Sequence, residues 1–399
     1  MRQAWRRLHA GAVAVVMLAM GGCAEVTEHL PFLAAPPPQE QQTTWTVPSG
    51  PGAALTPVRF DQLVGWTTDQ EGAALAAFLN GCTELTAEPD KALGGAGEAA
   101  ARGGTAAEWQ PACTAARAMP AGDDTAARGF FEAYFQAYGV SADGIAEGLF
   151  TGYFEPEVAG SLREGGVYRY PLLRRPPDLG AGQRPYFTRA EIERGALRNK
   201  HLELLWLADP IDVFFLHVQG AGRVRLPDGR IVRVTYDGQN GRTYVPIGRV
   251  LVDRGEMTLD QVSMQSIRAW LVAHPKEAAG VMDANPSYVF FREVADARPD
   301  QGPPSTLGVP LSPGRSIAVD KAFIPLGAPV WIDTEDPVDG AKMQRLMVAQ
   351  DLGGAIRGPV RADIFFGWGK DAEERAGRMR QHGMEILLLP KTTGTTAAR

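Results

Sequence analysis

The chain has 399 residues, of which 45% are hydrophobic and 22% charged, a composition typical of a folded protein long enough for two domains. Its formal net charge of −6 argues against a nucleic-acid binder, because such proteins carry a basic stripe that neutralises phosphates. The 6 histidines are scattered without metal-ligand spacing, and no nucleotide fingerprint is present, so we expect neither a metal nor a cofactor.

The first residues have the pattern of an export signal. Arg2, Arg6 and Arg7 precede an apolar run over residues 10–20, which is too short to span a bilayer. We therefore expect residues 1–22 to be a signal peptide that is removed from the mature protein.

Cys23 follows two glycines, and small residues before a cysteine resemble a bacterial lipobox. Cys23 is accordingly predicted to be lipidated, and residues 23–57, rich in Pro, Gln and Thr, to be a tether. Met20 stands where an aliphatic Leu is usual. An ordinary cleaved secretion signal with an incidental cysteine is the alternative.

Two helices and one strand are predicted in the first third of the body. Residues 69–80 are Ala-rich, and the aromatic residues of 125–138 recur at helical spacing, which is more typical of a core face than of a sugar platform. Residues 148–156 form an aromatic strand. In an exported chain the pair Cys82 and Cys113 is more often a disulfide than a catalytic or metal site.

The middle of the chain has a mainly β pattern. Residues 211–218 are predicted to be a buried strand in which His217 is a core residue, and residues 223–236 a hairpin around a Pro-Asp-Gly turn. Thr258 and Gln261 form a capping-box pattern, which predicts a helix that opens there and ends before Pro275.

The last third combines short strands, one helix over residues 370–381 and a final strand over residues 385–389. Many short strands with few helices favour a mainly β (α+β) fold of the barrel kind over a parallel α/β sheet.

Three aspartates in this third follow or begin strand patterns. Asp351 stands just before Gly353 and Gly354, where backbone can approach a ligand closely because no Cβ intervenes. Asp363 lies twelve positions later, and Asp320 precedes a Pro-Leu-Gly turn. This arrangement indicates acid/base chemistry on a bulky polar substrate, although aspartate and glycine also occupy turns for conformational reasons alone.

Several blocks in order resemble the membrane-bound lytic murein transglycosylase A (MltA) family with its three-aspartate domain. These blocks are Thr151 to Pro156, His217 to Gly222, Tyr236 to Gly241, Val319 to Gly327, Gln350 to Gly358 and Asp363 to Gly367. The similarity covers most of the chain after about residue 60.

The resemblance implies a double-psi β-barrel domain built from both ends of the mature chain, with a second, inserted β-rich domain and a groove between them. Residues 58–155 would form the first part of the barrel domain, residues 156–304 the insert, and residues 305–395 the second part, which is the three-aspartate domain.

The implied reaction is the cleavage of the β-1,4 MurNAc-GlcNAc bond of peptidoglycan without water, which leaves 1,6-anhydromuramoyl ends. This is the reaction of a lytic exotransglycosylase, a lyase acting on polysaccharide, although the residues leave exo- and endo-action open. One carboxyl can suffice, because the C6 hydroxyl of the substrate replaces the second group that glycosidases need. By its place in the motif, Asp351 is the expected general acid and then base. Asp320 and Asp363 would be supporting acids, either as nearby negative charge or through backbone or substrate hydroxyls.

Seven residues are expected to bind substrate, through aromatic stacking, amide hydrogen bonds or bare backbone. They are Gly353, Gly354, Tyr153, Phe154, Gln219, Tyr236 and Asn240. For each one alone, a role in packing or in a turn is an equally good interpretation.

The implied partners are peptidoglycan glycan strands and, through the lipid on Cys23, the outer membrane, with the protein facing the periplasm. Proteins of cell-wall synthesis are further partners that the sequence leaves open. A non-catalytic peptidoglycan-binding outer-membrane lipoprotein is the alternative function. An aspartic-type protease is disfavoured because the chain lacks a second matching Asp-Ser/Thr-Gly motif.

Overall fold

A computed structural model of the chain describes residues 43–49, 52–93, 103–180, 185–295 and 298–391. The predicted signal peptide, Cys23 and most of the predicted tether lie outside the described residues. Within those ranges, no helix has both the length and the apolar character needed to cross a bilayer.

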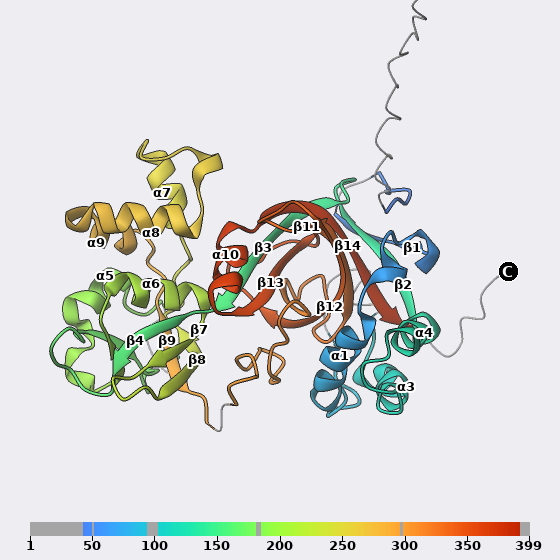
Figure 1. The fold of residues 1–399 in the computed structure, drawn as a ribbon, viewed down its shortest axis with the longest axis horizontal. Helices are drawn as coiled ribbons and strands as arrows, with labels where there is room; N and C mark the ends of the chain where they lie inside the picture. Colours follow the sequence, from blue (N-terminus) through green and yellow to red (C-terminus); the bar gives the residue numbers. More distant parts are fainter. Residues whose placement is uncertain (1–42, 50–51, 94–102, 181–184, 296–297, 392–399) are drawn as a thin grey trace, which may run out of the picture. The chain divides into compact units, whose positions relative to one another are not determined.

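Eight strands of the described chain form one sheet in the order β1-β2-β14-β11-β12-β10-β13-β3, and an additional pairing of β14 with β3 closes six of them into a barrel (Figure 1). The strands are β1 (Ala53–Val58), β2 (Phe135–Ala142), β3 (Glu147–Glu155), β10 (Ser316–Val319), β11 (Pro329–Glu335), β12 (Lys342–Leu352), β13 (Arg361–Trp368) and β14 (Arg380–Pro390). The pairings of β10 with β12 and of β13 with β3 are parallel. The barrel therefore joins the start of the globular chain to its end.

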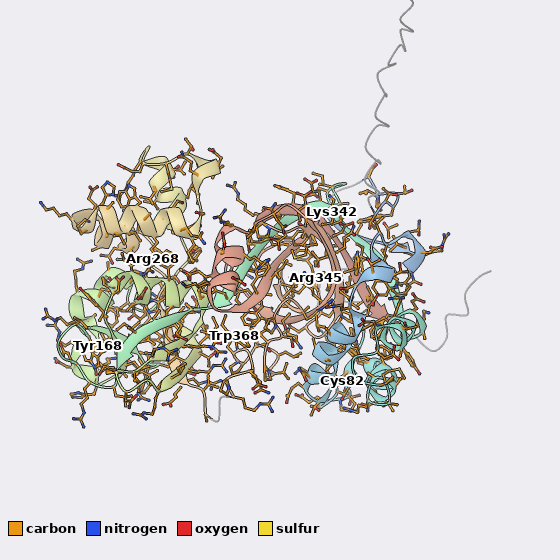
Figure 2. All side chains as sticks on the ribbon, viewed as in Figure 1. Cys82, Tyr168, Arg268, Lys342, Arg345 and Trp368 are labelled. Atoms are coloured by element: carbon orange, nitrogen blue, oxygen red, sulfur yellow. A yellow bond between two sulfur atoms is a disulfide. The ribbon has the colours of Figure 1, made fainter. Side chains whose placement is uncertain are left out.

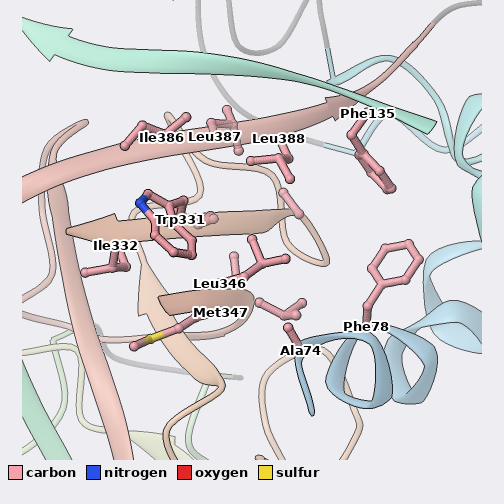
Figure 3. Close-up of a cluster of buried hydrophobic side chains, with 14 of the residues drawn as sticks. Ala74, Phe78, Phe135, Trp331, Ile332, Leu346, Met347, Ile386, Leu387 and Leu388 are labelled. Carbon is pink, nitrogen blue, oxygen red and sulfur yellow. The ribbon is translucent and has the colours of Figure 1, made fainter. Parts of the chain in front are cut away.

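The barrel strands are apolar on both faces. Trp331 and Ile332 of β11, Leu346 of β12 and Leu387 of β14 are fully buried, and Figure 3 shows them packed together. Burying each such side chain contributes roughly 1.5–3 kcal/mol. Because helices cover the outer face of these strands, both faces are buried. The strand sequences are therefore continuous apolar runs and do not alternate between apolar and polar residues.

Three helices pack beside the barrel: α1 (Glu71–Leu85), α3 (Ala106–Ala116) and α4 (Asp124–Tyr134). A disulfide joins Cys82 of α1 to Cys113 of α3. The predicted helix over 125–138 is shorter than expected, because Phe135 turns to extended backbone and begins β2. The ring of Phe135 is buried against Phe78 of α1. The aromatic residues of this segment therefore belong to the core as predicted, although they are divided between α4 and β2.

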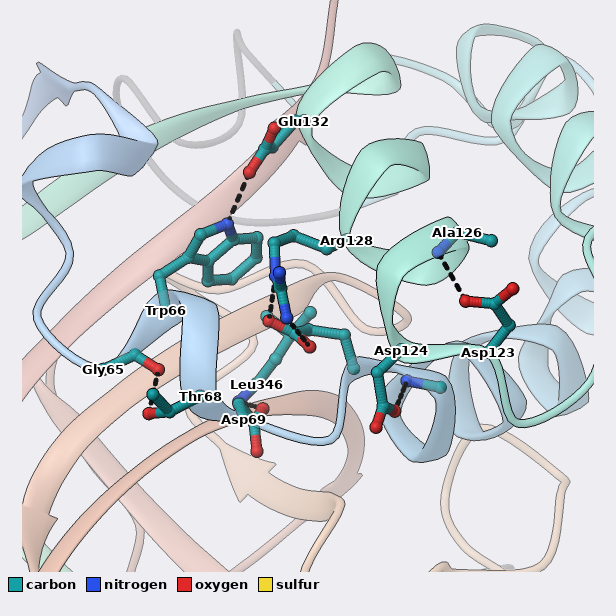
Figure 4. Close-up of polar contacts among 12 residues, drawn as sticks. Gly65, Trp66, Thr68, Asp69, Asp123, Asp124, Ala126, Arg128, Glu132 and Leu346 are labelled. Atoms are coloured by element: carbon teal, nitrogen blue, oxygen red, sulfur yellow. Dashed lines mark hydrogen bonds and ion pairs between the residues drawn. The ribbon is translucent and has the colours of Figure 1, made fainter.

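Asp69, just before α1, fixes the N-terminal part of the domain to the C-terminal strands; Figure 4 shows it beside Leu346 of β12. The Asp69 carboxylate accepts from the backbone N–H of Leu346 at 2.8 Å, and it also pairs with Arg315 at 2.7 Å. These partners lie 277 and 246 residues away in the chain. A hydrogen bond and an ion pair therefore connect the two parts of the barrel domain, in addition to apolar packing.

A second sheet has six strands of the described chain in the order β5-β6-β4-β7-β8-β9. They are β4 (Glu157–Ser161), β5 (Tyr170–Leu173), β6 (Glu203–Leu207), β7 (Ala221–Arg225), β8 (Ile231–Gln239) and β9 (Val289–Glu293). The helices of this region are α5 (Arg189–Glu191), α6 (Pro210–Gln219), α7 (Ile247–Asp253), α8 (Met264–Ala273) and α9 (Pro275–Asp283). The predicted hairpin is confirmed, since β7 and β8 pair antiparallel around the turn at Gly229.

The predicted strand over residues 211–218 is wrong, because this segment is helix α6. Asp209 caps the helix, Pro210 occupies its first turn, and Gly220 ends it in the left-handed conformation at φ 76°. One side of α6 packs on the sheet through Val213 and Leu216, and the other joins the cluster of α7 to α9. A helix buried on both sides has the same continuous apolar run as a buried strand, which explains the error.

The capping box at Thr258 is present, but it opens only a three-residue 3₁₀ turn. Helix α8 begins later, at Met264, with Ser263 as its cap. Pro275 lies in the first turn of α9 rather than beyond the end of a single helix. In the last third, α10 runs over Lys370–Arg378, three residues shorter than predicted, because β14 already starts at Arg380.

The chain leaves the barrel at the end of β3, at Glu155, and returns near residue 298. The two connecting segments lie close together because both contact the same pair of arginines. The Glu155 carboxylate is fully buried and pairs with Arg223 and Arg233 of the second sheet at 2.9 and 2.8 Å. Arg223 also donates to two backbone carbonyls of the returning segment and lies 4.2 Å over the ring of Trp368, labelled in Figure 2. Glu155, Arg223 and Arg233 thus connect the two sheets and the two segments through which the chain passes between them.

Glu385 of β14 is fully buried, and neither carboxyl oxygen reaches hydrogen-bonding geometry with a described group. Burial raises its pKa from 4.5 to about 8, although the charge of Arg361 opposes this shift. The native state thus keeps a proton that the unfolded chain releases near pH 4.5, so the stability should fall as the pH rises between these two values.

We predict that Glu385→Gln removes this pH dependence. Urea unfolding at pH 5 and pH 7.5 should show the parent losing about 3 kcal/mol relative to the variant over that interval. Parallel stability curves for the two proteins would contradict the prediction.

Candidate functional site

The strand register brings Asp351 and Asp363 to one level of the barrel. Ala318 of β10 pairs with Asp351 of β12 on one side and with Asp363 of β13 on the other. Asp363 in turn pairs with Thr151 of β3. Neighbouring strands lie about 4.8 Å apart, so the two carboxylates project from backbone positions about 10 Å apart. Both side chains are half-buried.

Asp351 lies at the end of β12 and accepts hydrogen bonds on both oxygens. The backbone N–H and the hydroxyl of Thr306 donate to its Oδ1 at 3.0 and 2.6 Å. The Tyr153 hydroxyl of β3 donates to its Oδ2 at 3.1 Å. Two segments distant in the chain therefore hold this carboxyl in one orientation.

Burial raises the pKa of the Asp351 carboxyl above its ordinary value, whereas the hydrogen bonds from Thr306 and Tyr153 act in the opposite direction. The pKa of Tyr153 is raised well above its usual value, first by burial and then by the charges of Asp351 and Asp363. Tyr153 is thus a neutral hydroxyl at neutral pH, able to donate to a carboxylate.

Asp363 is held differently. Its Oδ1 accepts from the Thr151 hydroxyl at 2.6 Å, and Arg361 donates to the same hydroxyl at 2.9 Å. Burial raises the pKa of Asp363, the Thr151 hydrogen bond and the charge of Arg361 lower it, and the charge of Asp351 raises it further. The two carboxylates therefore belong to one electrostatic unit.

Asp320 lies outside this unit in its bonding. One of its carboxylate oxygens accepts from the backbone N–H of Ala322 and the other from Gly358, each at 3.0 Å. The first contact closes the turn after β10, and the second fixes the loop that follows Asp351. These contacts favour a structural part for Asp320, as an anchor of the loop.

The two glycines after Asp351 have different surroundings. A Cβ on Gly353 would lie 2.4 Å from the Ile356 side chain, so the bare backbone is needed for packing within the loop. Gly354 is exposed, and a Cβ there would meet no atom within 4 Å. Gly354 is thus the one of the pair whose backbone faces open space.

Of the remaining expected residues, Phe154 of β3 and Gln219 of α6 connect the barrel to the second domain. The Phe154 ring is 5% exposed and packs on α10, and its backbone N–H donates to Gln219 Oε1 at 3.1 Å. Because its ring is buried, Phe154 cannot be a stacking platform. Tyr236, by contrast, is 49% exposed on β8.

Asn240 is buried and uses its amide within the protein. Its Nδ2 donates to the carbonyls of Phe187 and Pro286, both at 2.8 Å, and its Oδ1 accepts from the backbone N–H of Tyr288 at 3.0 Å and of Arg242 at 3.3 Å. The expectation that Asn240 binds an acetamido group is therefore corrected: its side chain holds three segments of the second domain together.

Sequence reasoning missed Thr306, and it gave no role to Thr151, Arg361 or Tyr244. Thr306 reaches Asp351 across 45 positions, and Thr151 reaches Asp363 across 212, so no local spacing indicates either contact. The pKa of Tyr244 is raised first by burial and then by the charge of Asp363, which places this residue of the second domain in the same field. Of these residues, only Thr151 could have been singled out from the sequence, because it begins the segment Thr151 to Pro156 that resembles the family.

Within the described residues, no group of three or more His, Cys, Asp or Glu side chains has the arrangement of a metal site. The site contains a half-buried carboxyl of raised pKa, a second carboxyl beside a cation, and hydroxyls that orient both. Such a set is suited to transfer of one proton to and from a bound substrate.

Two family models match the chain. One, the MltA specific insert domain, matches residues 149–292, and the other, the 3D domain, matches residues 315–389. The second match contains all three aspartates.

Known proteins are similar over longer stretches. Membrane-bound lytic murein transglycosylase A of Escherichia coli (strain K12) is 37% identical over 254 residues, covering 62% of this chain and 67% of that protein. The crystal structure of a membrane-bound lytic murein transglycosylase from Agrobacterium tumefaciens superposes with a TM-score of 0.75 at 36% identity, covering 84% of this chain and 98% of that one. The structure of E. coli MltA with bound chitohexaose has a TM-score of 0.64 at 28% identity, covering 90% and 99%.

Proposed function

Because this chain belongs to the membrane-bound lytic murein transglycosylase A (MltA) family, we propose that it cleaves the β-1,4 bond between MurNAc and GlcNAc in peptidoglycan and leaves 1,6-anhydromuramoyl ends. The observation that carries the proposal is the half-buried Asp351, held by Thr306 and Tyr153 beside a second carboxylate. The chitohexaose bound by a similar protein supports a glycan strand as the substrate class.

In the first step, the protonated Asp351 would give its proton to the glycosidic oxygen as that bond breaks. Because Oδ1 already accepts two hydrogen bonds from Thr306, Oδ2 beside the Tyr153 hydroxyl is the better placed oxygen to carry the proton. Thr306 then stabilises the negative charge that develops on the carboxyl during the transfer.

In the second step, the Asp351 carboxylate would take the proton of the muramoyl C6 hydroxyl while this oxygen bonds to C1. The proton balance is closed, since Asp351 ends in the state in which it began, and no water enters. Proximity within one sugar ring replaces the second carboxyl of ordinary glycosidases.

Substrate contacts form part of the same proposal. Gly354 offers exposed backbone next to Asp351, Tyr236 offers an exposed ring, and Gln219 stands at the connection of the two domains. The glycan would lie in a groove between the barrel domain, residues 58–155 and 305–395, and the insert, residues 156–304. The distribution of strands β1 to β3, β4 to β9 and β10 to β14 supports these limits.

The proposal is tested by digesting purified sacculi and identifying the released muropeptides by mass spectrometry. Anhydromuramoyl ends are expected. Reducing ends would make the protein a hydrolase, cut peptides a protease, and an absence of products a peptidoglycan-binding lipoprotein. Digestion in H₂¹⁸O adds a check, because a transglycosylase incorporates no label.

We predict that Thr306→Val slows the release of anhydro ends about tenfold, since a hydrogen bond to a charged group is worth roughly 1.5 kcal/mol or more. The lost hydroxyl favoured the carboxylate, so the pKa of Asp351 should rise and the alkaline limb of the pH profile should move to higher pH. Thr306→Ser, which keeps the hydroxyl, is the control. An alkaline limb that moves to lower pH would contradict this account.

We also propose that Cys23 carries the lipid that anchors the protein in the outer membrane, facing the periplasm, as the name of the membrane-bound relatives supports. Cys23→Ser should shift the protein from the membrane pellet to the soluble fraction without changing its activity on sacculi. A variant that stays in the pellet after a high-salt wash would refute the anchor. Proteins of cell-wall synthesis remain proposed partners, and co-purification from crosslinked membranes would identify them.

A further inference from the structure

The loop between β12 and β13, residues 353–360, crosses the end of the strand that lies between them, β10. Val319, the last residue of β10, pairs with Leu352 at the end of β12 on one side and with Ala362 near the start of β13 on the other. The loop therefore leaves and re-enters the barrel at one level, across two strand spacings, or about 10 Å. Each of the two pairs lies next to one of the site carboxylates, so the loop borders both of them.

Two contacts hold this loop in place. Asp320, which follows β10, accepts from the backbone N–H of Gly358 at 3.0 Å. Gly358 adopts a φ of 104°, which a residue with a Cβ rarely accepts. Ile356 is buried, and its backbone N–H donates to the carbonyl of Gly353 at 3.1 Å. The residue between the buried Ile356 and the anchored Gly358 is Arg357, so its backbone is fixed on both sides.

Arg357 combines this fixed backbone with a free charge. The residue is exposed, and no hydrogen bond or ion pair joins its guanidinium to another residue that the structure describes. A guanidinium stays charged at all ordinary pH values, and its planar fork of donors fits a carboxylate through two parallel hydrogen bonds. The loop thus carries a cation, six positions after Asp351, that is available to an anionic group of a bound ligand.

The proposed substrate carries its negative charge on one of its two sugars. The bond that breaks joins C1 of a muramoyl residue to the next GlcNAc, so the muramoyl residue must lie against the site carboxylates. MurNAc differs from GlcNAc by a lactyl group, to which the stem peptide is attached, and this arm bears carboxylates. GlcNAc has no such group. The sugar next to the loop is therefore the one that has an anionic arm.

We propose that Arg357 binds a carboxylate on the lactyl-peptide arm of the muramoyl residue, and so makes the protein select muramoyl glycans over neutral polymers of GlcNAc. The inference rests on the proposed function, because it takes a peptidoglycan strand as the ligand. It assigns a specificity-determining residue outside the three aspartates, and it gives the anchor at Asp320 a purpose, since that contact fixes the loop on which Arg357 stands.

The test compares binding of three ligands to the full chain on ice. Intact sacculi have peptide carboxylates, strands stripped of their peptides by an amidase have free lactyl carboxylates, and chitohexaose has neither. Arg357→Gln should weaken co-sedimentation with the anionic strands about fivefold, the scale of an exposed ion pair with good geometry, and leave the affinity for chitohexaose unchanged. Arg357→Glu should weaken it further, because like charges then face each other.

The two anionic ligands identify the source of the carboxylate. A loss on intact sacculi assigns the carboxylates of the stem peptide, because the lactyl group is there bound in an amide. A loss on stripped strands assigns the lactyl carboxylate. Either result supports the proposal. Unchanged binding to both kinds of strand would overturn it, as would an equal loss with chitohexaose.

Arg254→Gln is the matched control. Arg254 follows α7 in the second domain, is exposed, has no side-chain partner among the described residues and also precedes a glycine of positive φ, Gly255. This variant loses the same charge and should bind all three ligands as the parent does. A loss on anionic strands equal to that of Arg357→Gln would show a general effect of net charge and would refute the assignment.

Binding also separates this inference from the proposed function. If the parent binds strands but releases no anhydro ends, the proposed function fails, yet the comparison of Arg357→Gln with Arg254→Gln still decides whether Arg357 contacts a carboxylate. If anhydro ends are released and the two variants bind alike, the function stands and the inference fails.

Discussion

Asp351→Asn is expected to abolish the release of anhydro ends while the protein still folds and binds glycan. The amide cannot donate a proton to the glycosidic oxygen or accept one from the C6 hydroxyl, so both steps lose their carrier. General acid–base catalysis contributes on the order of 10² to 10⁴ in rate, and here one residue would supply both transfers. The drop in turnover should therefore be at least of this size.

The surroundings of Asp351 explain why this variant should stay folded. The amide oxygen can still accept from the N–H and hydroxyl of Thr306, and the amide nitrogen can donate to the oxygen of Tyr153, which reverses that hydrogen bond without moving either strand. Thermal unfolding and binding of chitohexaose serve as controls for fold and glycan binding. Near-normal turnover by a correctly folded Asp351→Asn protein would remove this residue from the mechanism.

Glu155→Gln is expected to destabilise the protein by about 4 kcal/mol, the scale for breaking a buried ion pair on one side. Glu155 has no exposed surface, and it compensates two arginines that are themselves buried, Arg223 and Arg233. Removing the carboxylate leaves two cations beside the backbone of the returning segment without a counter-charge. Chemical denaturation followed by tryptophan fluorescence measures the loss.

Glu157→Gln is the matched control for this prediction. Glu157 lies two positions further along the chain and also pairs with an arginine, Arg225, but their side chains are 41% and 51% exposed. An exposed pair contributes about 0 to 1 kcal/mol, so the control should unfold almost with the parent. Equal losses for the two variants would show that burial does not set the value of the Glu155 cluster.

The family and the fold class could be predicted from the sequence, and the comparisons confirm both. The blocks that carry the resemblance are local: Asp351 with its two glycines, and the turn after Asp320, are recognisable within a few residues. The hairpin around Gly229 was equally local and was predicted correctly. Segment 211–218 was not, because an apolar run does not say whether its two covered faces belong to a strand or to a helix.

The sequence by itself determined which side chains are candidates for the chemistry, since residue types and short spacings are properties of the chain. Only the tertiary structure decided which groups surround each candidate, because that depends on strand register and on closure of the barrel. Pairing through Ala318 sets the two carboxylates at one level, and contacts across 45 and 212 residues bring Thr306 to Asp351 and Thr151 to Asp363. Closure of the barrel buries both oxygens of Glu385, and packing within the second domain buries the amide of Asn240; no local pattern indicates either. A hydrogen bond needs donor and acceptor atoms within about 3 Å of each other, and a charge loses its water only when other groups pack around it. For residues so far apart in the chain, only folding brings about either condition.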